Sequence, residues 1–300
     1  MSLWIPFTLA AALFQTLRFM LQKYLSMGTL SAVGATFARF VYSAPLILVG
    51  LTLYLQGTGQ PLPVMPMAFW IYAVAGGVAQ ILATVCVVRL FQARNFAVGI
   101  TLKKTETVLA ALVGLIVLGE GVSLPGLGAI VMGLGGVLLL SGTPGLRQAW
   151  WRDLFSRATA LGLGAGLLFA VSAVCYRGAT LQLAASDPLL RAAVTLAAVV
   201  CWQVLVMTLW LAWRDRGELM AVWRARRVAL WVGLTSMAGS LCWFVAFALQ
   251  TAAYVKALGQ VELILSLMAS VLFFRERITR REIAGMGLLT LSVVGLLMVL

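Results

Sequence analysis

The chain has 300 residues, of which 62% are hydrophobic and only 10% are charged, and its mean hydropathy is +1.03. Soluble domains carry about 25% charged residues, so the composition excludes a soluble protein. The net charge of +13 comes mainly from Arg residues in short connections between apolar stretches, a pattern typical of membrane topology signals and not of nucleic-acid binding. Histidine is absent, and no metal or other cofactor is expected.

Ten apolar stretches, each about 20 residues long and therefore able to cross a bilayer, follow one another along the chain. They are expected near residues 4–25, 32–55, 67–91, 96–118, 124–142, 158–181, 187–212, 228–250, 254–274 and 281–300. The predicted fold class is an all-α membrane protein with ten transmembrane helices. The connections are short, so no separate catalytic domain is expected.

Basic residues alternate between the connections. The odd-numbered connections are rich in Arg, and the one at 214–227 carries five. Because cytoplasmic loops concentrate Lys and Arg, we expect these connections in the cytoplasm and both termini in the periplasm of a bacterial-type inner (plasma) membrane. Arg18 and Lys23, late in the first helix, are expected to snorkel to the inner interface. Charges of the even-numbered connections are expected near helix ends: Arg177, Arg191 and Lys256.

The chain reads as two copies of one unit. The segments 105–120 and 261–276 each place glutamates at the second and last positions, 156 residues apart between the copies. The connection after the first copy, 121–126, has no Lys or Arg, whereas the second is followed by an Arg-rich connection. Equivalent loops are therefore expected on opposite sides of the membrane, as in the inverted repeats of secondary transporters. The predicted units are a first five-helix repeat at 1–142, an interfacial linker at 143–157 and a second five-helix repeat at 158–300.

The glutamates at the start of the two copies, Glu106 and Glu262, are the main candidates for function. A charged group at bilayer depth is costly and marks a transport pathway or an ion pair. Two readings stay open for Glu106, namely contact with a translocation cavity and a structural pair with Lys103 one turn earlier. Glu120 and Glu276 lie at helix ends and are expected to tune a turn.

An amino acid needs a carboxylate for its ammonium group, donors for its carboxylate and an apolar wall for its side chain. Candidates for these roles are Glu106 or Glu262, then Lys104, Gln80 and Ser240, then Trp243, Tyr176 and Met237. Taken singly, an aromatic residue in a membrane helix is more often a packing or lipid-facing residue. The predicted substrate-binding residues are Gln15, Gln80, Thr84, Lys104, Glu106, Tyr176, Ser240, Trp243, Tyr254 and Glu262.

Three motifs carry a family resemblance: L-G-E-G-V-S-L-P-G at 118–126, F-R-E-R-I-T-R-R-E-I-A-G at 274–285 and K-K-T-E-T at 103–107. With two halves of five helices, the chain resembles the EamA-type members of the drug/metabolite transporter (DMT) superfamily over essentially its whole length. Among them it is most similar to aromatic amino-acid exporters. The resemblance implies that the first, third and fourth helices of each half line the cavity. The second half departs from the first at 260–262, where the paired lysines are missing.

The sequence and the resemblance together predict a secondary transporter that exports amino acids, aromatic and other apolar ones among them, by alternating access. The alternative is a multidrug or cationic-compound proton antiporter of the same superfamily. Small members of that kind depend on an acidic residue in the first helix, where this chain has Gln15 and Arg18. An intramembrane enzyme or a channel is less favoured, and the expected partners are the solute and membrane lipids, not nucleic acid. A monomer is compatible with the sequence.

Overall fold

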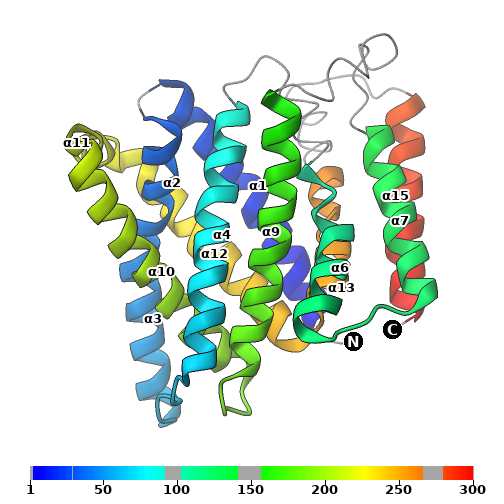
Figure 1. Ribbon diagram of the computed structural model, residues 1–300, viewed down its shortest axis with the longest axis horizontal. Coiled ribbons are helices and arrows are strands. Elements are labelled where there is room, and N and C mark those ends of the chain that lie inside the picture. The colour runs from blue at the N-terminus through cyan, green and yellow to red at the C-terminus, as the bar shows by residue number, and fades with distance from the viewer. Residues whose placement is uncertain (1–2, 29, 92–102, 141–156, 266–279, 300) are drawn as a thin grey trace.

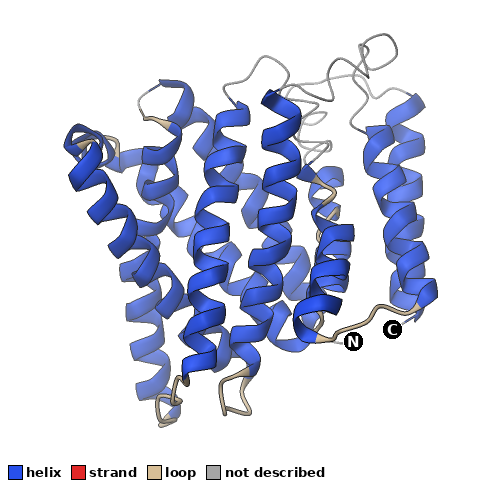
Figure 2. Cartoon of the chain, in the orientation of Figure 1, coloured by secondary structure: helices blue, strands red, loops and turns tan. Residues whose placement is uncertain are grey.

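The computed structural model describes residues 3–28, 30–91, 103–140, 157–265 and 280–299. Within these ranges every regular element is a helix (Figure 2), which confirms the all-α prediction for the described residues. The helices of the first half are α1 (Trp4–Gly28), α2 (Ala32–Val41), α3 (Ser43–Thr58), α4 (Met67–Phe91), α6 (Glu106–Leu118) and α7 (Leu124–Leu140). Those of the second half are α9 (Arg157–Leu181), α10 (Pro188–Arg214), α11 (Arg216–Arg224), α12 (Arg226–Leu249), α13 (Ala252–Leu258) and α15 (Arg280–Val299).

The long helices stand side by side as a bundle, and both chain ends lie at its lower end in the view of Figure 1. Six described segments are long and apolar enough to cross a membrane: Trp4–Ser26, Ala32–Thr58, Met67–Leu90, Thr159–Leu181, Pro188–Arg214 and Arg226–Leu249. Shorter apolar helices are Glu106–Leu118, Leu124–Leu139 and Ile283–Met298. The full count of ten crossings depends in part on residues 92–102 and 266–279, which lie outside the described residues. The predicted linker, 143–157, also lies outside them except for its last residue.

Two elements differ from the predicted helices. The second predicted helix is divided at Tyr42 into α2 and α3, because Pro45 lacks the amide hydrogen that would bond to Val41 and its ring crowds that carbonyl. The basic connection 214–227 contains α11, whose N-cap is Asp215 with its side chain accepting from the amide of Glu218. The apolar-stretch criterion could not find α11, since the helix is short and polar.

Helices of the first half pack mainly on helices of the second half. α4 lies along α9, α1 along α12, and α7 along α15. The last pair comes especially close at Gly136, where an added Cβ would lie 2.8 Å from the backbone nitrogen of Leu289. Without a hydrophobic drive between helices in lipid, such close backbone approach is a main source of helix association. The interior of the bundle is therefore an interface between the two halves.

Candidate functional site

Seven charged side chains are buried inside this interface. They are the cations Arg18, Arg39, Lys103, Lys104 and Lys256 and the carboxylates Glu106 and Glu262, each at most 8% exposed. Among the described residues these are all the buried Lys, Arg, Asp and Glu side chains. Each charge at bilayer depth costs at least about 2.5 to 3.5 kcal/mol on insertion scales. The buried charges of the described residues are gathered here, which marks the cluster as the candidate site.

The fourth predicted helix of each half is interrupted at the cluster. α6 begins only at Glu106, after a turn at Lys104 and Thr105. α13 ends at Leu258, and a turn at 259–260 separates it from a further helical stretch at 261–265. The fourth and ninth predicted helices are therefore not continuous, and the two turns lie within one residue of equivalent positions in the predicted repeat.

The turns are tightened by hydrogen bonds that span three residues instead of four. The amide of Glu262 donates to the carbonyl of Gly259 at 3.1 Å, and that of Thr107 donates to the carbonyl of Lys104 at 3.5 Å. A short stretch of this kind inside a membrane helix often marks a hinge. In secondary transporters, discontinuous helices supply the binding site. Both glutamates lie in the first turn after such a break, where the helix dipole favours a carboxylate.

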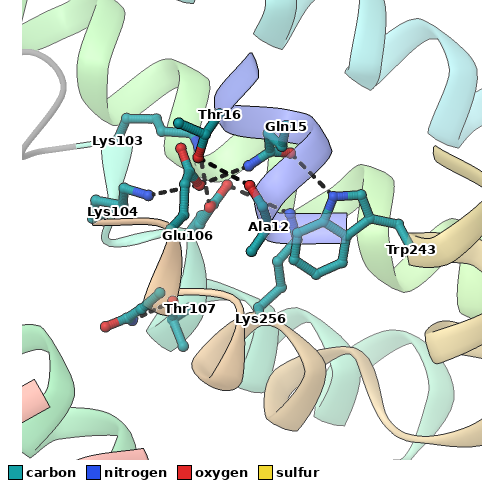
Figure 3. Close-up of polar contacts among 11 residues, drawn as sticks. Ala12, Gln15, Thr16, Lys103, Lys104, Glu106, Thr107, Trp243 and Lys256 are labelled. Carbon is teal, nitrogen blue, oxygen red and sulfur yellow. Dashed lines mark hydrogen bonds and ion pairs between the residues drawn. The ribbon is translucent and has the colours of Figure 1, made fainter. Parts of the chain in front are cut away.

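The two glutamates are held in ion pairs, and Figure 3 shows Glu106 with the neighbouring lysines. Lys104 Nζ lies 3.0 Å from Glu262 Oε2, and Lys103 Nζ lies 3.2 Å from Glu106 Oε1. Lys256 Nζ approaches the other oxygen of Glu106, Oε2, at 3.7 Å, which is too long for a hydrogen bond. The pairs of Lys104 and Lys256 join residues of opposite halves, so the ion pairs tie the halves together at the helix breaks.

Gln15 on α1 connects this network to an aromatic ring. Its Nε2 donates to Glu262 Oε2 at 2.8 Å, and its Oε1 accepts from Trp243 Nε1 at 3.2 Å (Figure 3). Lys256 Nζ lies 4.8 Å from the centre of a Trp243 ring, a cation–π distance. Gly259 leaves room for this ring, because an added Cβ there would overlap with Trp243 Cη2. The helix break thus positions both the carboxylate and the indole.

A small cavity of about 30 Å³ lies beside the network. Its walls come from both halves: Gln15, Arg18, Arg39, Gln80, Phe169, Ser172, Ala173, Tyr176, Ser240, Trp243, Phe244, Phe247 and Lys256. The Tyr176 and Phe244 rings pack 4.4 Å apart between centroids, and the Trp243 and Phe247 rings stack at 5.8 Å. The cavity therefore combines aromatic walls with amide, hydroxyl and cationic groups.

The Arg39 side chain donates hydrogen bonds to three hydroxyl groups. Its Nε donates to Ser236 Oγ at 2.9 Å, its Nη1 to Thr84 Oγ1 at 3.0 Å and its Nη2 to Ser240 Oγ at 3.4 Å. Arg18 Nη1 donates to the amide oxygen of Gln22 at 2.9 Å. None of the ion pairs of the described residues involves either arginine, so neither guanidinium group contacts a carboxylate directly among the described residues.

The comparisons bear on the half of the chain that supplies most of the aromatic wall. Residues 156–298 match the EamA-like transporter family. This EamA match covers just under half of the chain, contains Tyr176, Ser240, Trp243, Lys256 and Glu262, and indicates a membrane transporter. A solved structure described only as "Crystal structure of protein" aligns with 99% of this chain and 96% of its own, with a TM-score of 0.72 and 13% identity. That likeness shows the fold alone. No curated protein matches the chain.

The structure gathers most of the predicted site residues at the interface between the EamA-matched half and the first half. Those that line the cavity are Gln15, Gln80, Tyr176, Ser240 and Trp243. Those that form the adjacent network are Lys104, Glu106 and Glu262. Thr84 lies behind Arg39 as its hydrogen-bond partner. Glu106 lies in ion pairs with Lys103 and Lys256, of which only Lys256 belongs to the cavity wall.

Tyr254 lies apart from this group. Its hydroxyl contacts the backbone nitrogen and Oγ of Ser123, both at 3.3 Å, and its ring packs against Gly126 at the start of α7. The structure thus gives it a role in a helix contact. Ser123 Oγ also accepts from the amide of Gly126 at 3.2 Å, so Ser123 caps the start of α7. Thr279, the corresponding residue, lies outside the described residues.

Several residues of the site had no predicted role in it. The prediction that Arg18 snorkels to the interface is wrong, because its side chain is 3% exposed and lines the cavity. Lys256 lies near a helix end as expected, in the last turn of α13, but its side chain reaches Glu106 and Trp243. Arg39 and Phe169 were also missed. The usable signal was that Arg39 is an ionisable residue within an apolar stretch, which is a functional hypothesis by default.

Chemistry that needs a metal has no support in the described part of the chain. No three His, Cys, Asp or Glu side chains come together there to hold an ion. The four cysteines, Cys86, Cys175, Cys201 and Cys242, are free thiols. What the site offers is recognition of a small solute by charge, hydrogen bonds and aromatic contacts.

Proposed function

We propose that the whole chain is an EamA-type secondary transporter that exports small organic solutes by alternating access. The observation that carries the proposal is the placement of the ion pairs. Lys104–Glu262 and Lys256–Glu106 cross between the halves beside a cavity lined by both. A solute that disturbs these pairs can alter the contact between the halves, which is what alternating access requires. The EamA match of residues 156–298 supports the same reading.

The packing supports two inverted five-helix repeats as the moving units. Exchanging the halves turns the α4–α9 contact into the α12–α1 contact, and both pairs lie along one another over much of their length. The same exchange maps α7–α15 onto itself. The two halves also resemble each other locally, because each has a helix break, at 104–105 and at 259–260. In this proposal, the repeats are 1–142 and 158–300, joined through the linker 143–157.

For the substrate we propose amino acids, including aromatic and other apolar ones. Trp243, Phe244 and Tyr176 form a wall suited to an aromatic or large apolar side chain. The carboxylate can be bound by the guanidinium of Arg39 or the ammonium of Lys256. The ammonium group of the amino acid needs a hydrogen-bond acceptor. The amide oxygen of Gln15 can serve, or a carboxylate oxygen of Glu106 or Glu262 once its ion pair with a lysine is broken. The excess of cations disfavours the alternative of a cationic-compound antiporter.

Counterflow in proteoliposomes tests this function directly. Vesicles loaded with a panel of unlabelled amino acids are expected to accumulate the matching radiolabelled amino acid, with and without a pH gradient. Ser240→Leu, which fills the cavity, should abolish accumulation. Thr52→Leu, which adds the same side chain at an exposed position of α3, should behave as the wild-type protein does. If no amino acid accumulates above protein-free vesicles, the amino-acid assignment is wrong.

We further propose that the protein lies in a bacterial-type inner membrane with both termini in the periplasm. The exposed tryptophans Trp213, Trp223 and Trp231 around the basic helix α11 fit an interface on the cytoplasmic side. Alkaline phosphatase fused after Leu300 should be active, and the same enzyme inserted at 214–227 should be inactive. The reverse pattern would overturn the orientation and leave the repeat intact.

A further inference from the structure

The charge balance around the cavity is uneven. Five buried cations face two buried carboxylates, which leaves an excess of three positive charges among the described residues. Arginine stays protonated in proteins, so the charges of Arg18 and Arg39 cannot be removed by loss of a proton. Both guanidinium groups line the cavity, and their hydrogen bonds to described residues go to neutral oxygens. Buried charges of this kind are normally paired.

The two carboxylates are already occupied. Glu262 Oε2 receives both Lys104 Nζ at 3.0 Å and Gln15 Nε2 at 2.8 Å, and Glu106 lies between Lys103 and Lys256. Neither glutamate belongs to the cavity wall. A substrate ammonium group must therefore displace a lysine from its carboxylate, or approach three lysines and two arginines without a counter-charge. A substrate carboxylate faces no such obstacle.

We propose that the cavity selects aromatic carboxylates of net negative charge, and that amino acids are its weaker, zwitterionic ligands. The carboxylate lies between Arg39 and Lys256, which line the same cavity, and neutralises part of the excess charge. The aromatic ring stacks on the wall formed by Trp243 and Phe244. This inference rests on the proposed function, since it names the class of solute that the same site takes.

Arg39 and Lys256 can each donate a hydrogen bond to the carboxylate of the substrate. Arg39 is held rigidly by three hydroxyl partners, Ser236, Thr84 and Ser240, of which the last is the most distant at 3.4 Å. An anion in the cavity can replace that long contact with a charge-assisted bond. Lys256 Nζ lies 3.7 Å from Glu106 Oε2, too far for a hydrogen bond, so this contact does not prevent Lys256 from donating to an anion in the cavity.

Three compounds with the same ring and chain length separate the charges. Phenylalanine is the zwitterion, 3-phenylpropionate lacks its ammonium group, and phenethylamine lacks its carboxylate. We expect isothermal titration of the purified full-length protein to show 3-phenylpropionate binding about tenfold or more tightly than phenylalanine, and no binding of phenethylamine. The uncharged 3-phenylpropanamide measures the contribution of the ring.

Variants assign the effect to the cavity. Arg39→Gln and Lys256→Gln should each weaken 3-phenylpropionate binding by about tenfold to a hundredfold, and change binding of 3-phenylpropanamide by about threefold or less. The ratio of the two affinities is measured within each variant, so a lower folded fraction does not alter it. Arg214→Gln removes the same charge at an exposed position at the end of α10 and should leave the ratio unchanged.

The outcomes are separate from those of the amino-acid counterflow assay. If phenethylamine or phenylalanine binds as tightly as 3-phenylpropionate, or if both variants keep the wild-type ratio, the anion preference is wrong even when amino acids are transported. Absence of binding by all four compounds also overturns it. If 3-phenylpropionate binds as expected and no amino acid gives counterflow, the inference stands and the amino-acid assignment falls.

Discussion

The two helix breaks are built on the same plan with different side chains. At the first break the chain has Lys103 and Lys104, and at the second it has Gly259 and Gln260, each 156 residues further on. The glutamate that follows is the same in both. Lys104 crosses to the opposite half and pairs with Glu262, whereas Gln260 crosses in return and donates to Thr107 Oγ1 at 2.6 Å. Equivalent positions thus form a charged contact in one direction and a neutral one in the other.

This difference shows which parts of the site follow from the repeat. The backbone break and the two glutamates are common to both halves. The cations are not, because Lys103 and Lys104 belong to the first half and Lys256, one turn before the second break, belongs to the second. The excess positive charge of the cavity therefore arises from residues that break the symmetry, and these are the residues we expect to decide the substrate.

The charged contact should be the stronger of the two. Glu262→Gln leaves Lys104 buried without a counter-charge, and we expect it to lower the free energy of unfolding by about 3 to 5 kcal/mol. Adding Lys104→Gln removes the orphaned charge and should restore most of the loss. Reversible unfolding in mixed micelles measures both. Additive effects of the two substitutions would mean that the pair does not couple the halves.

The glycine of the second break should matter through packing. Gly259→Ala forces its Cβ into the Trp243 ring, so we expect a loss of about 1 to 3 kcal/mol. The matched control is Gly128→Ala on α7, where an added Cβ meets nothing within 4 Å and stability should rise by up to about 1 kcal/mol. The same unfolding assay applies. Equal effects at the two glycines would show that the break does not depend on close contact with Trp243.

The smallest effect concerns selectivity. Trp243→Ala removes one stacking surface from the cavity, a contact of about 0.5 to 1.5 kcal/mol. Transport of phenylalanine or tryptophan should fall about three- to tenfold relative to transport of alanine or threonine. Competition among amino acids in the counterflow assay gives this ratio. A uniform loss for all substrates would assign Trp243 to packing alone.

Most of the fold could be predicted because length and hydropathy determine where a chain can cross a bilayer. The helix breaks could not be predicted in this way. The run from Tyr254 to Leu265 remains apolar on average, and at the second break the only local signal for a 3₁₀-type turn is one glycine, Gly259. Pro45 was a readable signal for the division between α2 and α3. The short polar helix α11 requires local capping by Asp215, which a hydropathy criterion does not detect.

The site was predictable in its glutamates and aromatic residues and not in its arginines. Counting Lys and Arg near span ends assigns topology, and that criterion placed Arg18 and Lys256 at the interfaces. Their depth could be estimated from position along the helix, but the direction in which each side chain points depends on helix rotation and packing. Tyr254 shows the converse error, because its aromatic ring faces α7 and not the cavity.

The central claim is that the cavity between the halves is the transport site, and thiol labelling of Ser240→Cys tests it most directly. The variant is made in a background without Cys86, Cys175, Cys201 and Cys242. A membrane-impermeant maleimide should label it, and 3-phenylpropionate or phenylalanine should slow the labelling. Ser292→Cys, at the buried α7–α15 contact where Ser292 Oγ donates to the Ala129 carbonyl, should stay unlabelled. If Ser240→Cys reacts no faster than Ser292→Cys, or at a rate that neither solute changes, the cavity is not the transport site.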